Sequence, residues 1–285
     1  MTGKPYIDTH VHFWDLQQQI NSWVAQSKDQ ELHQNFLPES FIIKSPQNLK
    51  GLVHIEAHDS TIPTEIEQAW LQEIMSPFPD LDFKSIAYAD LTQDPRTFEK
   101  IIYGLQKYPS FIGIRHILSY RPNSTYSPCQ KELSQHPNII KNLHLLKQQD
   151  LIFECQCYAE QLLNLLPAIQ SSQVTCVIEH VLLPNHRNDA DKILWLKALE
   201  KAGKLKNTYI KLSGLDLFNK KLNTEKIIKT CLLFFGASHC LYGSNHPVSH
   251  LNQPGNWFQK LNQLDLSLIE KQQIFYSTAK QVYQI

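Results

Sequence analysis

Short apolar runs rich in β-branched and aromatic residues recur along the chain, and the segments between them mostly repeat apolar positions with helical spacing. We predict eight strands, at Tyr6–His12, Leu52–Ala57, Lys84–Asp90, Phe111–Arg115, Leu151–Gln156, Val174–His180, Thr208–Ser213 and Cys240–Ser244. The predicted helices are Thr64–Met75, Arg96–Lys107, His136–Gln148, Gln161–Gln170, Asp189–Ala202, Thr224–Phe235 and a last one near Ser267–Tyr283. Strands that alternate with helices in this way are typical of a parallel sheet with right-handed crossover connections.

The number of strand–helix units decides between the two common parallel architectures. Eight units within 285 residues fit a closed (β/α)8 TIM barrel of the α/β class better than an open doubly wound sheet. The sequence also contains no G-x-G-x-x-G or Walker loop, which removes the main support for a nucleotide-binding open sheet. Because no internal repeat, Pro/Ser linker or break in composition interrupts the pattern, we expect residues 1–285 to form a single domain.

The connection after the first predicted strand is unusually long. It runs from Phe13 to Lys50 and is rich in Gln, Asn and aromatic residues. Loops of this length are uncommon in compact domains and usually cover a functional site. We therefore expect the connection to fold over the mouth of the barrel.

Composition and charge exclude several classes of partner. Lys and Arg (27) balance Asp and Glu (27), so nucleic acids and anionic membranes are poor partners. The first residues lack the apolar core of a signal peptide, and no stretch reaches the roughly 18 apolar residues of a membrane helix. The cysteines lack metal-finger spacing, and most lie in apolar runs, as expected of free thiols in a reducing cytoplasm: Cys129, Cys155, Cys157, Cys176, Cys231 and Cys240. We expect a cytoplasmic protein that acts on a small molecule, and its oligomeric state stays open.

Histidines at predicted strand ends are the first candidates for chemistry, because a (β/α)8 barrel carries its active site at the carboxyl ends of its strands. Strict alternation in the first strand places Tyr6, Asp8, His10 and His12 on one face, which we assign to the barrel interior. Two imidazoles at i and i+2 suit two ligands of one divalent cation, or one imidazole that orients the other. His180, at the end of the sixth strand, completes a predicted catalytic and metal-binding group.

Charged residues at other strand ends are predicted to bind substrate. Only four of the 27 basic residues are Arg, and three of these four fall at or just after the ends of the fourth and sixth strands. The planar guanidinium binds carboxylates through two parallel hydrogen bonds, so this placement favours an anionic substrate. Surface salt bridges are an equally weighted alternative for Arg121 and Arg187. The predicted substrate-binding residues are Arg115, Arg121, Arg187, Glu56 and Glu154.

Several segments together resemble one enzyme family. The segments are IDTHVHFWD at 7–15, FIGIRHIL at 111–118, FECQ at 153–156, IEHVLLP at 178–184, YIKLSGL at 209–215 and FGASHCLYGSNHPVS at 235–249. In this order they resemble the amidohydrolase-related lactonases, the family of fuconolactonase, rhamnonolactonase and 2-pyrone-4,6-dicarboxylate lactonase. The resemblance implies a metal-dependent-hydrolase type of (β/α)8 barrel, with His10 and His12 as its strand-one pair, His180 as its strand-six histidine and Arg115 in contact with substrate. Some members of the family hold zinc at this cluster, and others work without metal.

Two positions depart from the family pattern. After strand eight the family usually reads G-S-D-W-P-V, whereas this chain has Asn245 and His246 in place of the aspartate and tryptophan. The family's D-H-x-G-K-P is replaced by EHVLLP, which lacks the lysine. The neutral amide of Asn245 cannot accept a proton near pH 7 and binds cations poorly. Either His246 acts as the base, or Glu56, Asp90 or Glu154 supplies the carboxylate, or hydrolysis has been lost and only binding remains.

These observations predict a lactonase-like hydrolase of a small, anionic sugar-acid or related lactone. The predicted catalytic residues are His10, His12, His180, Asn245 and His246. The histidines, or a divalent metal such as zinc that they hold, would polarise the lactone carbonyl, and His246 would activate water. Without the aspartate at position 245 we expect metal occupancy to be weak or partial, or the enzyme to be metal-independent. The alternatives are a non-catalytic barrel that binds a small anion, and a decarboxylase of the wider superfamily.

Overall fold

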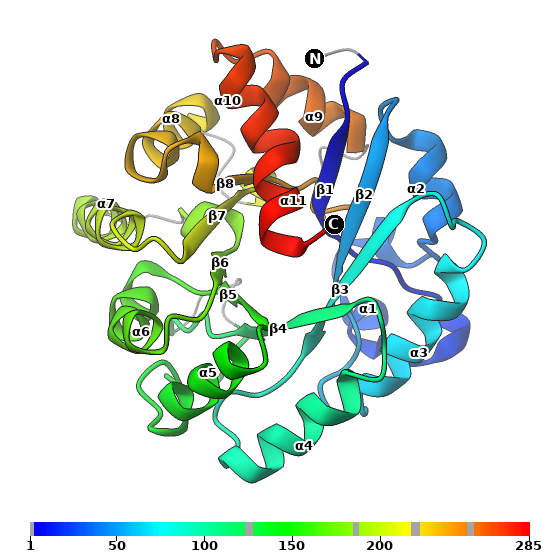
Figure 1. Cartoon of the computed structure of the whole chain (residues 1–285), viewed down its shortest axis with the longest axis horizontal. Helices are drawn as coiled ribbons and strands as arrows, with labels where there is room; N and C mark the ends of the chain where they lie inside the picture. The colour runs from blue at the N-terminus through cyan, green and yellow to red at the C-terminus, as the bar shows by residue number, and fades with distance from the viewer. Residues whose placement is uncertain (1–2, 123–127, 185–187, 218–222, 250–253) are drawn as a thin grey trace.

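The computed structural model describes residues 3–122, 128–184, 188–217, 223–249 and 254–285. Within these ranges, eight parallel strands form one sheet in the order β1 to β8 (Figure 1). The strands are β1 Tyr6–Val11, β2 Leu49–Ile55, β3 Asp82–Tyr88, β4 Phe111–Ile117, β5 Ile152–Gln156, β6 Cys176–Ile178, β7 Thr208–Leu212 and β8 Cys240–Tyr242. All eight predicted strands are present, with boundaries that differ by a few residues.

The first and last strands meet and close the sheet into a barrel. Val11 forms a parallel bridge with His246, and the His12 amide donates a 2.7 Å hydrogen bond to the His246 carbonyl. The Asn245 amide donates a 2.8 Å hydrogen bond to the His10 carbonyl. These contacts lie at the carboxyl ends of β1 and β8, and they confirm the predicted (β/α)8 barrel.

Helices surround the barrel (Figure 1). They are α1 Ser22–Gln26, α2 Pro38–Lys44, α3 Thr64–Met75, α4 Pro95–Leu105, α5 Asn138–Gln148, α6 Ala159–Ser172, α7 Asp189–Gly203, α8 Thr224–Phe235, α9 Pro254–Asn262, α10 Leu268–Gln272 and α11 Thr278–Tyr283. The sequence predicts α3 and α8 with their observed bounds. The predicted final helix corresponds to α10 and α11, which a π-helical turn at Gln273–Ser277 joins into one continuous helical segment.

Helix α11 closes the amino end of the barrel, near its centre in Figure 1. Its residues Ala279, Val282 and Tyr283 pack into an apolar cluster with strand residues such as Val53 and Val177. Apolar side chains therefore fill this end of the barrel. The polar interior is left to the carboxyl end, where the candidate site lies.

The predicted alternation of β1 is wrong in the first half of the strand. Tyr6 packs outside the barrel, with its ring centroid 4.7 Å from that of Phe258, whereas Ile7 joins the interior apolar cluster. The reason is a register irregularity between Asp8 and Val11, which shifts the side-chain alternation along the strand. A prediction based on strict alternation of side chains between the two faces of a strand cannot anticipate this irregularity.

The long connection after β1 packs against the carboxyl ends of the strands, as predicted. Asn21 Nδ2 donates a 2.7 Å hydrogen bond to the Ala57 carbonyl, just after β2. The rings of Phe36 and Phe41 contact His246, just after β8, with centroid distances of 5.5 and 5.2 Å. Among the described residues, no helix is long and apolar enough to span a membrane.

Candidate active site

Three histidines meet inside the carboxyl end of the barrel. His10 lies on β1, His12 directly follows that strand, and His180 follows β6. The Nε2 atoms of His10 and His12 are 3.1 Å apart, and the ring centroids of His10 and His180 are 4.5 Å apart. Burial lowers the pKa of all three imidazoles well below the usual value, so they are neutral at pH 7. The structure therefore brings together the three residues that the sequence predicts as a cluster.

Hydrogen bonds orient two of these imidazoles. His12 Nδ1 lies 2.8 Å from the Ile55 carbonyl oxygen, which can only accept a hydrogen bond. Nδ1 therefore carries the proton of the neutral ring, and Nε2 presents a lone pair. His180 Nδ1 lies 2.9 Å from the hydroxyl of Ser213, which directly follows β7 and fixes that ring. Imidazoles held in this way are typical of both metal ligands and proton-transfer groups.

Two glycines make room for the imidazoles. A Cβ atom on Gly214 would lie 2.6 Å from His180 Nδ1, and the Gly214 φ angle of +62° is one that favours glycine. A Cβ atom on Gly243 would lie 2.7 Å from the His10 Cβ atom. Larger residues at either position would displace a ring of the cluster.

Glu179 supplies a carboxylate to the cluster and was not predicted from the sequence. It immediately follows β6 and is fully buried. Its Oε1 atom lies 3.7 Å from His10 Nδ1, and its Oε2 atom lies 4.0 Å from His180 Nε2. Oε1 has no hydrogen-bond partner in the described parts of the chain. A glutamate between the apolar segments CVI and VLL was the available signal, because a carboxylate is rarely buried without a partner or a function.

His10, Glu179 and His180 fit a divalent metal ion. Each offers one ligand atom, and these atoms all lie within 4.8 Å of one another. Neutral imidazole nitrogens and carboxylate oxygens are zinc ligands. The Oε1 atom of Glu179 has no hydrogen-bond partner among the described residues, so its lone pairs can coordinate such an ion. This carboxylate directly follows β6, whereas the family places its carboxylate at the position of Asn245.

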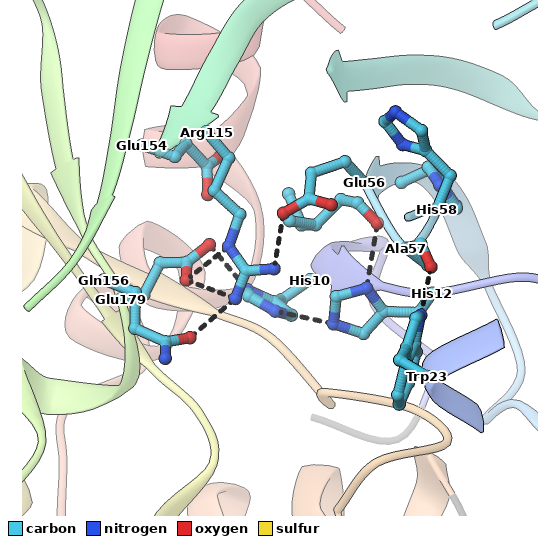
Figure 2. Close-up of polar contacts among 12 residues, drawn as sticks. His10, His12, Trp23, Glu56, Ala57, His58, Arg115, Glu154, Gln156 and Glu179 are labelled. Atoms are coloured by element: carbon cyan, nitrogen blue, oxygen red, sulfur yellow. Dashed lines mark hydrogen bonds and ion pairs between the residues drawn. The ribbon is translucent and has the colours of Figure 1, made fainter. Parts of the chain in front are cut away.

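Arg115 connects this cluster to the rest of the site. From β4, its Nε atom donates a 3.0 Å hydrogen bond to Glu179 Oε2, and its NH1 atom donates a 3.1 Å hydrogen bond to Glu56 Oε1. Its NH2 atom donates a 2.6 Å hydrogen bond to Gln156 Oε1 (Figure 2). Burial opposes the charge of Arg115, but Glu179 and Glu56 outweigh burial and raise its pKa. The guanidinium thus holds two carboxylates from opposite sides of the site.

Glu56 stands between Arg115 and a cavity of about 530 Å3. Burial raises the pKa of Glu56 to about 7, although Arg115 acts in the opposite direction. The cavity lies over the ends of β2, β3 and β4, and its wall also includes Trp23, His58, Tyr88, Asp90 and His116. A carboxyl group that titrates near neutral pH at a cavity wall is suited to proton transfer.

Glu154 lies deeper in the barrel. It forms an ion pair with Lys211, and its Oε1 atom accepts a 2.7 Å hydrogen bond from the Tyr283 hydroxyl. Lys211 Nζ in turn lies 3.4 Å from His10 Nδ1. Burial raises the pKa of Glu154 to about 7, against the effect of Lys211. This pair lies beneath the histidines, and Lys211 was missed because a single lysine within TYIKL resembles an exposed strand residue.

The two candidates after β8 occupy different surroundings. Asn245 is buried, and its backbone lies in the left-handed region at φ +57°, which asparagine tolerates. Its Nδ2 atom has no hydrogen-bond partner among the described residues. His246 packs against Phe36 and Phe41. Burial and, to a smaller extent, Lys44 lower the pKa of His246 to about 3. His246 lines a separate cavity of about 170 Å3, whereas Glu56 lines the larger one.

Of the two other predicted arginines, the structure describes Arg121, which does not join the cluster. Arg121 donates from Nε and NH2 to both carboxylate oxygens of Glu160, at 2.9 Å each, and its guanidinium lies over the Tyr158 ring. Arg187 lies outside the described residues.

Residues 7–285 match the amidohydrolase family. The chain belongs to this family. A relative with an assigned activity is the L-fucono-1,5-lactonase of Burkholderia ambifaria, which is 24% identical over 88% of this chain and 84% of its own length. The family membership and this relative confirm the resemblance to lactonases that the sequence motifs indicate.

Solved structures of the same fold cover nearly the whole chain. An amidohydrolase from Burkholderia multivorans with bound zinc has a TM-score of 0.77 at 19% identity, over 99% of this chain and 100% of its own. A probable 2-pyrone-4,6-dicarboxylic acid hydrolase from Acinetobacter baumannii with bound citric acid has a TM-score of 0.71 at 18% identity, with the same coverage. A 2,6-dihydroxybenzoate decarboxylase has a TM-score of 0.70 at 13% identity, again over 99% and 100% of the two chains. At these identities the likeness concerns the fold.

Proposed function

We propose that the protein is a lactonase-like hydrolase, in which water attacks the carbonyl carbon of a small lactone bound beside Glu56. The observation that carries this proposal is the position of Glu56. Its carboxyl group has a pKa raised to about 7, lines the cavity of about 530 Å3, and is joined through Arg115 to the carboxylate of the histidine cluster. Family membership and the fuconolactonase relative support a hydrolytic reaction on a lactone.

Glu56 acts as the general base in this proposal. Its ionised carboxylate accepts a proton from the attacking water, and Arg115 holds the carboxylate in place. This assignment follows one of the three alternatives that the sequence left open for Asn245. His246 is a weaker candidate, because burial keeps its pKa near 3 and aromatic side chains surround it.

His10, Glu179 and His180 would hold a zinc ion in this proposal. A bound divalent ion there supplies a Lewis acid for the lactone carbonyl. Arg115 already hydrogen-bonds Glu179 Oε2 and shares its negative charge, so we expect metal occupancy to stay weak or partial. Ser213 and the Ile55 carbonyl orient the imidazoles whether or not the ion is bound.

A small uncharged lactone suits the described cavity better than an anionic one. Both described arginines near the barrel mouth, Arg115 and Arg121, already pair with carboxylates. The lining residues that the structure describes include Asp59 and Asp90 but no Lys or Arg. The anionic substrate expected from the sequence therefore depends on Arg187, which lies outside the described residues.

The test is a lactone panel assayed with zinc-loaded and chelator-treated protein at pH 6–8. The panel pairs neutral 1,5-aldonolactones, L-fucono-1,5-lactone included, with a carboxylated lactone, and ring opening is followed with a pH indicator. We expect turnover of neutral lactones well above the uncatalysed rate. No turnover of any lactone, together with a melting temperature raised by small anions, would instead support a binding module. Release of CO2 from dihydroxybenzoates would support a decarboxylase.

A further inference from the structure

A buried carboxylate lies behind the cavity wall, between two histidines. Glu67 projects from α3 and is fully buried. Its Oε1 atom accepts a 2.8 Å hydrogen bond from the Ala57 amide and lies 3.4 Å from His54 Nε2. Its Oε2 atom lies 3.2 Å from His58 Nδ1. Glu67 and His58 therefore form a close buried ion pair, although neither Glu67 Oε2 nor His58 Nδ1 makes a hydrogen bond among the described residues.

His58 belongs to the wall of the same cavity as Glu56. Its side chain is buried, and its Nε2 atom has no hydrogen-bond partner in the part of the chain that the structure describes. A buried ring nitrogen without a partner is unfavourable unless a ligand or a water molecule pairs with it. A polar atom of a bound substrate would satisfy it.

The charges around His58 favour its protonated form. The titratable groups that surround it are Glu56 and Asp59 on its own segment, Glu67 on α3, Tyr88 and Asp90 at the end of β3, and His116 on β4. Burial opposes the charge of His58, but Glu67 outweighs burial, with help from Glu56 and Asp59, and raises the pKa of His58. Burial opposes the charge of Glu67, but His54 and His58 outweigh burial and hold the pKa of Glu67 well below its usual value, so Glu67 stays ionised.

We propose that His58 is a second catalytic residue of the cavity, which donates a proton from Nε2 to the departing alcohol oxygen of the lactone, and that Glu67 is its positioning residue. This inference rests on the proposed hydrolase function. The water oxygen bonds to the acyl carbon, and Glu56 takes the water proton. As the bond between the acyl carbon and the ring oxygen breaks, the His58 proton goes to that oxygen. Solvent then carries the proton from Glu56 back to His58, and the net reaction is lactone plus water to hydroxy acid.

The experiment compares two leaving groups. D-Glucono-1,5-lactone releases an alkoxide that needs a proton, whereas dihydrocoumarin releases a phenolate that is a good leaving group without one. We expect His58→Gln to lower kcat/KM on gluconolactone by about 10²–10⁴-fold, and on dihydrocoumarin by less than about tenfold. Glu56→Gln should lower both rates. His239→Gln, at the opposite end of the barrel, is the matched control and should change neither.

The pH profile tests the role of Glu67 separately. Since the protonated form of His58 is the active one, kcat/KM for gluconolactone should fall at high pH as His58 loses its proton. Glu67→Gln should lower the pKa of His58 and move this alkaline limb to lower pH, which a merely structural role would not do. Imidazole NMR of His58 in folded Glu67→Gln protein measures the same pKa without turnover.

The outcomes separate the two proposals. An active wild type whose His58→Gln variant loses as much on dihydrocoumarin as on gluconolactone, or loses nothing on either, overturns the role of His58 and leaves the hydrolase proposal standing. An unmoved alkaline limb and an unmoved NMR pKa in Glu67→Gln overturn the role of Glu67. A wild type that hydrolyses no lactone overturns both proposals.

Discussion

Arg115 pairs twice with one carboxylate oxygen of Glu179, through a hydrogen bond from Nε and an ion pair from NH2, and leaves the other oxygen near His10. The Nε and NH2 atoms of Arg115 lie 3.0 and 2.9 Å from Glu179 Oε2, while Glu179 Oε1 lies 3.7 Å from His10 Nδ1. One carboxylate thus joins the guanidinium to the histidine cluster. Through its NH1 atom, the same guanidinium also fixes Glu56 at the cavity.

Replacement of Arg115 should destabilise the protein strongly. Arg115→Met leaves Glu179 and Glu56 buried without their counter-ion, and breaking a buried ion pair in this way typically costs about 3–5 kcal/mol. The measurement is the free energy of unfolding in urea at pH 7.5, with Arg96→Met, whose side chain is exposed on α4, as the control. A loss no larger than that of the control would show that Arg115 does not hold these carboxylates in solution.

Removal of the Glu179 charge should weaken metal binding. Glu179→Gln keeps the shape of the side chain but takes away the anionic ligand beside His10 and His180. We expect zinc affinity to fall by at least the roughly 10–100-fold that is typical of a lost supporting interaction. Competition with a chromophoric chelator measures the affinity, and Glu99→Gln, exposed on α4, is the control. Equal affinity in the two variants would place the metal elsewhere.

The two residues after β8 should respond differently to substitution. Asn245→Asp introduces the carboxylate that the family usually carries, and it should raise zinc affinity and turnover. His246→Ala removes a ring packed against Phe36 and Phe41, so it should lower the melting temperature without changing the pH profile of kcat/KM. Abolished turnover in a folded His246→Ala protein would instead identify His246 as the base.

The raised pKa of Glu56 predicts a pH dependence of stability. Its pKa is about 7 in the folded protein and about 4.5 when unfolded, so between these values the folded state binds more protons than the unfolded state. The contribution of Glu56 to the free energy of unfolding is therefore present in full below about pH 4.5 and is lost as the pH rises through 7. Urea titrations at pH 5 and 8 should show that wild type loses stability relative to Glu56→Gln on going from 5 to 8. A constant difference would contradict the raised pKa.

The fold was largely predictable because each strand and most helices carry their own local signal. Helices α3 and α8, whose apolar positions recur with clear helical spacing, match their predicted bounds. The short helices α1 and α2 were not predicted, since they lie in a Gln- and Asn-rich connection whose aromatic residues pack against distant strand ends. The irregularity in β1 arises from its pairing with β2, and the sequence of β1 alone carries no information about that pairing.

The site was predictable where a motif or a strand end marked it. His10, His12, His180 and Arg115 meet because all four lie at carboxyl ends of strands. Glu179 and Lys211 were missed because each stands in an apolar segment, and their partners come from other strands: Arg115 on β4 and Glu154 on β5. Glu67 was missed because it lies on a helix that presented no local sign of its contact with His58.

The most direct test of the central claim is kcat/KM for a neutral 1,5-aldonolactone in wild type, Glu56→Gln and the exposed control Glu99→Gln, measured from pH 5 to 9. We expect Glu56→Gln to lose about 10²–10⁴-fold at pH 7.5, as is typical when a general base is removed. In wild type and in the control, kcat/KM should rise with pH through about 7, where Glu56 ionises, and this rise should be absent from Glu56→Gln. A folded Glu56→Gln protein with the rate and pH profile of wild type would contradict the assignment of Glu56 as the base.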